Sequence, residues 1–220
     1  MTARFPPVIL EGMRVITGKF RGRKLQAPPG RGVRPPLDRV KEGYFNIVQG
    51  QVAGSNFLDL FAGSGSMGIE ALSREARRVV FVEKRRDAQA VLEHNLEHVR
   101  LLLPYDPHIR MRPTAPGVEN DAFEILPLDA KEGISRLAVR GETFQLAFVD
   151  PPYDYPHHES LLALLAESGT LDASSLVTIH HHKKRPMPPR VSNGILEQVR
   201  TRAYGQSVLS FYRLAAAAER

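Results

Sequence analysis

A glycine-rich loop between an apolar segment and a helical segment constrains the fold of this chain more than any other feature. The loop lies within residues 58–68 and spaces Gly63, Gly65 and Gly68 as G-x-G-x-x-G. Glycine lets the backbone turn tightly and approach a ligand closely. A strand, a glycine loop and a helix in this order are typical of the first βαβ unit of nucleotide-binding sheets. The loop therefore predicts an α/β fold with a ligand at the carboxyl end of its first strand.

Strands and helices are expected to alternate along the rest of the chain. Short apolar runs predict strands at 56–60, 78–82, 123–128, 143–149 and 176–179. Apolar residues at helical spacing predict helices after residue 37 and at 67–74, 85–100, 130–139 and 160–166. Residues 195–202 and 207–214, separated by Tyr204-Gly205, predict a terminal antiparallel hairpin. The pattern indicates a Rossmann-like, mostly parallel seven-stranded sheet with helices on both faces.

The segments outside this alternation divide the chain into three parts. Residues 1–36 predict a basic N-terminal arm, with a small β-hairpin formed by residues 14–16 and 24–26. Residues 37–214 form the α/β domain, and residues 215–220 form a tail. Within the domain, residues 103–121 carry four prolines and little periodicity, so we expect a long loop there.

Charge and cysteine content narrow the classes of function. The chain of 220 residues has a formal net charge of +6 and a pI of about 9.8, which favours polyanionic partners. It has no cysteine, which excludes disulfides, thiolate metal sites and cysteine nucleophiles. No apolar run approaches the roughly 20 residues of a membrane span, and no secretory signal precedes the domain. We expect a cytoplasmic monomer with no metal and no membrane partner.

Acidic residues around the glycine loop indicate which ligand it binds. Glu83 ends the second strand, where a carboxylate can accept both hydroxyls of a ribose. The loop and Glu83 alone fit either a nicotinamide dinucleotide or S-adenosylmethionine. Asp59, just before the loop, favours S-adenosylmethionine, because a carboxylate repels a pyrophosphate and suits an ammonium group. Asp129 follows the third strand and can be an acceptor for an adenine amino group, the N-cap of the next helix, or both.

The tetrapeptide Asp150-Pro151-Pro152-Tyr153 ends the apolar strand at 143–149. Proline fixes φ and lacks an N–H, so the backbone here is stiff and its carbonyls are free to accept. Asp150 and the Pro151 carbonyl then offer two acceptors for the two hydrogens of an exocyclic amino group. Tyr153 can stack on a base, an interaction of about 1–3 kcal/mol. We therefore expect the four residues to hold an amino group in line with an activated methyl.

The chain resembles a known family at these positions and beyond them. Residues 59–65, Glu83 and Asp150–Tyr153 resemble class I S-adenosylmethionine-dependent methyltransferases that methylate amino groups. The runs at 14–25 (R-x-x-x-G-x-x-R-G-R-x-L) and 34–42 (R-P-x-x-D-R-V-x-E) resemble the small-subunit (16S) ribosomal RNA guanine-N2 methyltransferases of the RsmD type. Residues 204–207 resemble the closing hairpin of that family. Two features depart from it: the 103–121 segment is longer, and His180 stands where the family has a glutamate.

The resemblance implies methylation of the N2 amino group of a guanine in ribosomal RNA, free or within a small-subunit particle. It implies S-adenosylmethionine as cofactor, bound by Asp59, Phe61, Ala62, Gly63, Ser64, Gly65, Glu83, Lys84 and Asp129. The catalytic candidates remain Asp150, Pro151, Pro152 and Tyr153. The exact nucleotide stays open.

Basic residues near the amino terminus are candidates for RNA contact. Nine basic residues and one acid, Asp38, lie between Arg14 and Lys41. We expect phosphate contacts from Arg21, Arg23, Lys24, Arg34 and Arg39. The alternative is a solvated basic face. Residues 180–185 form a second basic cluster beyond a strand end, either an RNA contact or a plain loop, and three consecutive histidines in an extended chain do not converge on zinc.

Other functions explain less of the sequence. A nicotinamide-dependent oxidoreductase accounts for the glycine loop and Glu83 but leaves the tetrapeptide at 150–153 without a role. A catalytically silent RNA-binding protein accounts for the basic arm but needs none of the acidic residues. Amino methyltransferases acting on adenine or cytosine in DNA or RNA, or on protein glutamine, use the same tetrapeptide. The small size, without a separate DNA-recognition domain, favours RNA.

Overall fold

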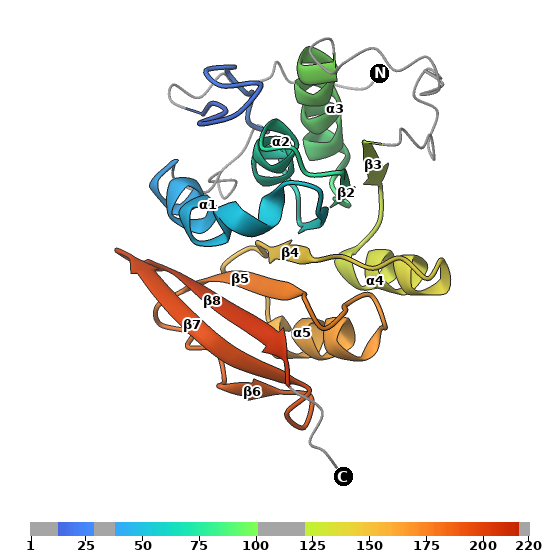
Figure 1. Cartoon of the computed structure of the whole chain (residues 1–220), viewed down its shortest axis with the longest axis vertical. Helices are drawn as coiled ribbons and strands as arrows, with labels where there is room; N and C mark the ends of the chain where they lie inside the picture. Colours follow the sequence, from blue (N-terminus) through green and yellow to red (C-terminus); the bar gives the residue numbers. More distant parts are fainter. Residues whose placement is uncertain (1–12, 29–37, 101–121, 216–220) are drawn as a thin grey trace.

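The computed structural model describes residues 13–28, 38–100 and 122–215 of the chain (Figure 1). The loop expected at 103–121, the candidate Arg34 and most of the tail lie outside the described residues.

One eight-stranded sheet forms the centre of the molecule, in the order β3-β2-β1-β4-β5-β8-β7-β6. Its parallel part consists of β1 (Asn56–Leu60), β2 (Arg78–Val82), β3 (Phe123–Leu126), β4 (Leu146–Val149) and β5 (Leu176–His182). The hairpin of β7 (Leu196–Tyr204) and β8 (Ser207–Leu214) is antiparallel, and β8 joins it to β5. The predicted mostly parallel sheet with a terminal hairpin is confirmed.

The strands differ from the prediction in several places. β3 ends at Leu126 and not at residue 128, and β4 begins at Leu146 and not at residue 143. A short strand, β6 (Arg190–Val191), pairs with β7 and makes the sheet eight-stranded rather than seven-stranded. Two residues are too few to show the alternation that marks a strand in a sequence. β5 continues beyond Ile179 to His182, so the histidines lie within the strand and not past its end. Pairing with β8 extends it, since His180 lies opposite Leu209 and His182 opposite Ser207.

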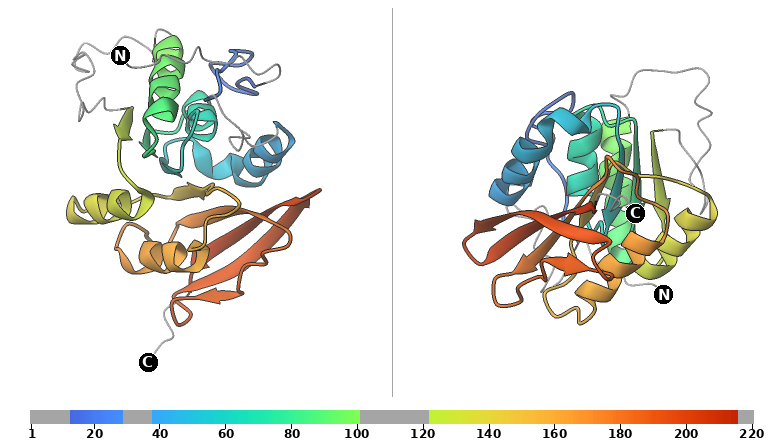
Figure 2. Two further views of the ribbon diagram at one scale, coloured as in Figure 1. Left: turned by 180° about the vertical axis from the view of Figure 1, so that it is seen from behind. Right: turned by 60° about the horizontal axis from the view of Figure 1, so that its bottom comes forward.

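Helices cover both faces of the sheet (Figure 2). On one face, α1 (Asp38–Val52), α2 (Ser66–Ser73) and α3 (Arg86–Arg100) share a core with Phe57, Phe148 and Phe211. On the other face, α4 (Ala130–Val139) and α5 (His158–Glu167) pack on Leu58, Ala147 and Val177. In β4 and β5, residues 148 and 178 point to the first face, and residues 150 and 180 continue that alternation. None of the helices in the described ranges combines the length and the apolar character that a membrane span requires.

The N-terminal segment, residues 13–28, packs onto the first face as an antiparallel pair of short stretches. Arg14 and Lys24 form an antiparallel bridge, and the Val15 N–H donates to the Arg23 carbonyl at 2.9 Å. Met13, Val15, Phe20 and Leu25 are buried in the core of α1, α2 and α3. The segment therefore shares a core with the α/β domain. The boundary expected at 36/37 falls outside the described residues and stays a prediction.

A buried ionic cluster fixes the N-terminal segment to α2. The Glu70 carboxylate accepts from the Ile16 N–H at 2.7 Å and the Thr17 N–H at 3.0 Å. The Lys41 ammonium donates to the Arg14 carbonyl at 2.6 Å and lies 4.0 Å from Glu70. Lys41 is fully buried, so this member of the basic run is a structural residue and does not reach RNA. Gly18, at φ 88°, passes so close to α2 that a Cβ would lie 1.9 Å from the Ser73 carbonyl oxygen.

Candidate active site

The glycine loop turns sharply at the end of β1 and leads into α2. Phe61, Gly63 and Gly65 have positive φ values of 61°, 55° and 77°. Neighbouring side chains leave no room for a Cβ atom at Gly65 or Gly68. A Cβ on Gly65 would lie 2.2 Å from a Leu92 methyl group, and one on Gly68 would lie 2.2 Å from the Phe81 ring. The glycine spacing thus lets the loop turn and lets α2 pack directly on β2.

Asp59 lies under this loop with its carboxylate almost completely buried. Its Oδ2 accepts a hydrogen bond from the Gly68 N–H at 2.9 Å. Burial raises the pKa of Asp59 well above its ordinary 3.8, and the charges of Asp150 and Glu83 act in the same direction against the Gly68 hydrogen bond. Asp150 and Glu83 therefore both repel a negative charge on Asp59, and a cationic ligand group would relieve this repulsion.

Glu83 follows β2 and is fixed by the backbone on both sides. Its Oε2 accepts from the Gly63 N–H at 2.9 Å, and its Oε1 accepts from the Arg85 N–H at 2.8 Å. A carboxylate oxygen accepts more than one hydrogen bond. Glu83 therefore holds the glycine loop while each oxygen keeps capacity for a ligand hydroxyl.

The structure shows one of the two roles open for Asp129. Asp129 is the N-cap of α4: its carboxylate accepts from the Lys131 N–H at 3.1 Å. It also accepts from the Lys84 ammonium at 3.0 Å, and it does not line the cavity described below. The geometry favours the capping role. Lys84 itself lies on the cavity wall.

The tetrapeptide at 150–153 leaves the sheet directly beside the glycine loop. The Asp150 N–H donates to the Leu60 carbonyl at 3.2 Å, which joins the carboxyl ends of β4 and β1. The Tyr155 N–H donates to the Pro152 carbonyl at 2.9 Å and closes the turn. Tyr153 is 43% exposed, and its hydroxyl contacts Ser207 Oγ at 3.1 Å. The tetrapeptide is thus a short rigid turn with an accessible aromatic ring.

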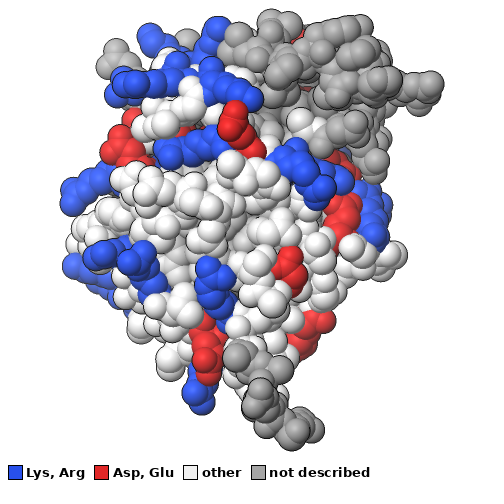
Figure 3. All heavy atoms as spheres, in the orientation of Figure 1, with Lys and Arg blue, Asp and Glu red and all other residues white. Residues whose placement is uncertain are grey.

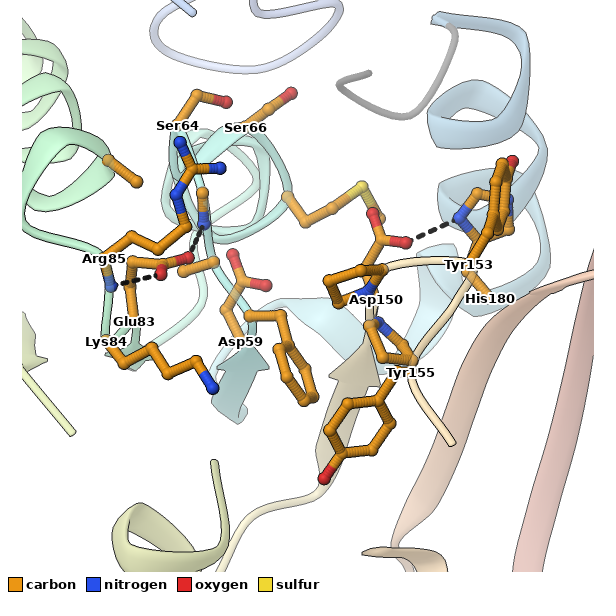
Figure 4. A pocket seen from close by; sticks show the side chains of 17 residues that line it. Asp59, Ser64, Ser66, Glu83, Lys84, Arg85, Asp150, Tyr153, Tyr155 and His180 are labelled. Carbon is orange, nitrogen blue, oxygen red and sulfur yellow. Dashed lines mark hydrogen bonds and ion pairs between the residues drawn. The ribbon is translucent and has the colours of Figure 1, made fainter. Parts of the chain in front are cut away.

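His180 is a site residue that the sequence did not identify as one. Its Nδ1 lies 2.7 Å from Asp150 Oδ1 (Figure 4). Burial lowers the pKa of His180, but the charge and the hydrogen bond of Asp150 outweigh it and the net direction is upward. The signal was present in the register: β4 and β5 pair in parallel with Phe148 opposite Thr178, so Asp150 and His180 continue that pairing. The prediction ended β5 one residue too early to use it.

Of the two neighbouring histidines, His182 packs edge-on against Tyr153, with ring centroids 5.6 Å apart. His181 points away from the Asp150 side, where its Nε2 contacts Ser210 Oγ at 2.9 Å. In residues 13–28, 38–100 and 122–215, no group of three or more metal-ligating side chains comes together.

One cavity of about 430 Å³ unites the glycine loop and the tetrapeptide. Figure 4 shows Asp59 and Glu83 on one side of it, with Asp150, Tyr153 and His180 on the other. Of the predicted residues, those on its wall are Asp59, Phe61, Ala62, Gly63, Ser64, Glu83, Lys84 and Asp150–Tyr153. Gly65 and Asp129 are not on the wall, and Ser66, Met67, Arg85, Ala88, Tyr155 and His180 are additional lining residues. Tyr155 packs edge-on against Phe61 at 5.2 Å between ring centroids.

The basic candidates lie outside this cavity. Arg21, Arg23 and Lys24 are exposed on the N-terminal segment, and Arg39 is exposed in the first turn of α1. Lys and Arg side chains gather over the region of the N-terminal segment in Figure 3. Within residues 13–28, five basic residues are accompanied by no acid.

The fold and the cavity define the class of the protein. The parallel sheet with a closing antiparallel hairpin, and a ligand-sized cavity at the carboxyl ends of its strands, are those of the class I methyltransferases. The solved structure described as "Putative methyltransferase yhhF from Escherichia coli" matches with a TM-score of 0.72 at 28% identity, covering 92% of this chain and 98% of that one.

The chain belongs to the family described as "Conserved hypothetical protein 95", which matches residues 13–213. It is 32% identical over 201 residues to "Putative rRNA methyltransferase YlbH" of Bacillus subtilis, covering 91% of this chain and 98% of the relative. It is 31% identical over 207 residues to "Ribosomal RNA small subunit methyltransferase D" of Escherichia coli K12, covering 94% and 92%. The family resemblance seen in the sequence motifs is confirmed.

Proposed function

We propose that this protein transfers a methyl group from S-adenosylmethionine to the exocyclic N2 amino group of a guanine in small-subunit ribosomal RNA. The observation that carries the proposal is the shared cavity, in which the glycine loop with Glu83 meets the tetrapeptide at 150–153.

The charge of the cavity fits a cationic methyl donor. Asp150 and Glu83 both repel a negative charge on Asp59, and S-adenosylmethionine carries a sulfonium and an ammonium group. A pyrophosphate would add negative charge beside buried Asp59. Lys84 and Arg85 also line the cavity, but each is paired with an acid, Asp129 and Asp87 respectively. Glu83 would hold the ribose hydroxyls, and the loop backbone at 61–63 would contact the rest of the donor.

The residues of this chain do little covalent chemistry in the reaction. S-adenosylmethionine supplies a methyl group already activated on a sulfonium. Asp150 and the Pro151 carbonyl hold the two amino hydrogens and aim the nitrogen lone pair, while Tyr153 stacks on the base. The nitrogen forms the new N–C bond as the S–C bond breaks, and the electron pair of that bond stays on sulfur. The proton that nitrogen sheds passes to Asp150 Oδ2 and from there to solvent.

Two observations support ribosomal RNA as the substrate. The relatives over most of the chain are named as ribosomal RNA methyltransferases. The exposed basic residues of the N-terminal segment offer contacts to phosphates beside the glycine loop. The choice of guanine rests on the family resemblance, because Asp150 and the Pro151 carbonyl would hold an adenine or cytosine amino group equally well.

Transfer of labelled methyl tests the proposal. Labelled S-adenosylmethionine is incubated with the protein and either free small-subunit RNA, assembled small-subunit particles, large-subunit RNA or DNA. We expect label in one or both small-subunit substrates and little in the others. Calorimetry with S-adenosylhomocysteine and with a nicotinamide dinucleotide tests the cofactor separately. Tight binding of the dinucleotide alone would overturn the assignment.

A further inference from the structure

The hydrogen bond between buried His180 and half-buried Asp150 has no role in the reaction as proposed above. His180 is 5% exposed, and its Nδ1 is within hydrogen-bond distance of Asp150 Oδ1. A carboxylate only accepts, so with Asp150 ionised the shared proton lies on Nδ1 of the imidazole. Among the described residues Asp150 Oδ2 has no hydrogen-bond partner. The pair therefore presents one engaged oxygen and one free oxygen at the cavity.

We propose that His180 is a positioning residue for methyl transfer, which holds Oδ1 of Asp150 so that Oδ2 meets the substrate amino group. The proposal rests on the proposed function and assigns a role to a side chain that the mechanism above does not use. An unrestrained carboxylate rotates about its Cβ–Cγ bond, and a fixed hydrogen bond removes that freedom before the substrate arrives.

The surroundings of His180 suit this role. Tyr153 packs edge-on against the imidazole with ring centroids 5.8 Å apart, so the stacking ring and the acceptor are supported by one side chain. On β8, the residue paired with His180 is the apolar Leu209. Asp150 is the charged group that acts on His180, and His181 and His182 are its titratable neighbours along β5. His180 Nε2 is buried and has no partner in the described residues, so no competing contact pulls the ring away.

The protonation state of His180 then controls Asp150. In the neutral form, Nδ1–H donates to a fully basic carboxylate, which can take the proton that the amino nitrogen sheds. In the imidazolium form, the added charge lowers the basicity of Asp150 and leaves a second N–H buried at Nε2. Turnover should therefore rise with pH as His180 loses its proton and level off above its pKa.

Three variants separate this role from a merely structural one. In His180→Asn, the amide nitrogen replaces Nδ1 as donor and does not titrate. We expect turnover within about threefold of wild type at high pH, without the histidine limb of the pH profile. In His180→Leu, the loss of a hydrogen bond to a charged group should lower kcat about 10-fold or more at every pH. His181→Asn, which changes the neighbour on the opposite face, should keep the wild-type pH profile.

Two further readouts keep the outcomes distinct. The affinity for S-adenosylhomocysteine should be unchanged in all variants that keep the wild-type melting temperature. The imidazole ¹⁵N resonances of His180 should show a proton on Nδ1 and a pKa that falls in Asp150→Asn, a measurement that needs no substrate. An active wild-type enzyme whose pH limb persists in His180→Asn, or full turnover in a folded His180→Leu, overturns the role of His180. A wild-type enzyme with no methyl transfer to small-subunit RNA overturns the proposed function instead.

Discussion

The side-chain amide of Asn95 donates a hydrogen bond to the backbone carbonyl of Ser64 at 2.9 Å, which ties α3 to the glycine loop. The same side chain accepts from the Gln26 N–H at 2.8 Å and donates to the Gln26 carbonyl at 2.9 Å. Asn95 is 2% exposed, so these bonds are shielded from water. One residue thus joins the N-terminal segment to the loop that would hold the methyl donor.

Replacing Asn95 should therefore weaken both the fold and donor binding. Asn95→Ala leaves the buried Ser64 carbonyl and the half-buried backbone groups of Gln26 without partners, at a cost of about 2–3 kcal/mol in unfolding free energy. Donor affinity should fall about tenfold, because the loop loses its support. Chemical denaturation and calorimetry measure the two effects. His98→Ala, on the exposed side of the same helix, is the control and should change neither; equal effects in both variants would contradict the coupling.

The ionised carboxylate of Asp59 should lower the stability of the folded chain while it strengthens donor binding. The pKa of its carboxyl is higher in the folded chain than its ordinary value of 3.8, so the folded state binds the proton more tightly. Stability should then fall as pH rises from that ordinary value through the raised folded one. Asp59→Asn should be more stable than wild type at neutral pH by about 1 kcal/mol and bind the donor about tenfold more weakly.

Asp172 is a suitable comparison for Asp59, because its pKa is shifted in the opposite direction. Burial raises the pKa of Asp172, but hydrogen bonds from Ser174, Gln145 and Ser175 outweigh it and the net direction is downward. Asp172→Asn should therefore destabilise the chain at neutral pH. Thermal melts of the two variants across pH 4 to 8 test the contrast. A loss of stability in Asp59→Asn would mean that its hydrogen bond to Gly68 outweighs the burial of its charge.

Asp150 should matter for turnover far more than for donor binding. Asp150→Ala should lower kcat about 100-fold or more with little change in the affinity for S-adenosylhomocysteine. Its Oδ2 acts on the amino group, whose charge develops only in the transition state. Asp154→Ala, an exposed acid in the same turn, is the control. Full activity of a correctly folded Asp150→Ala would refute the mechanism.

The exposed basic residues of the N-terminal segment should act on RNA through charge. Replacing Arg21, Arg23 and Lys24 by alanine should weaken RNA binding. It should also reduce the slope of the logarithm of the binding constant against the logarithm of the salt concentration by up to about 3. Donor binding should be intact. Arg136→Ala, an exposed change in α4 on the opposite face of the sheet, should leave the slope unchanged. An unaltered slope in the triple variant would mean that these three side chains do not contact RNA phosphates and only form a solvated surface.

The fold and half of the site were predictable because their signals are local. The glycine spacing, Glu83 at a strand end and Asp150 after an apolar strand each depend on neighbours in sequence, and parallel strands bring their ends to one edge. The structure places Asp59, Glu83 and Asp150 on one cavity accordingly.

The features that the sequence did not reveal depend on pairing between distant segments. β5 extends through His180 because β8 pairs with it, and without that extension the contact with Asp150 is invisible. In the sequence Lys41 is one of the nine basic residues from 14 to 41, but Glu70 and the Arg14 carbonyl hold its side chain in the core. Asp129 suited two roles, and only the position of Lys84 and Lys131 shows that it caps α4.

The identity of the methylated atom tests the central claim most directly. Small-subunit RNA from a strain lacking the protein is reacted with labelled S-adenosylmethionine and digested, and its nucleosides are separated. We expect all enzyme-dependent label in N2-methylguanine, at one position in the RNA. Label in N6-methyladenine, in a methylated cytosine or on a ring carbon would contradict it, as would small-subunit RNA that stays unlabelled both free and within the particle.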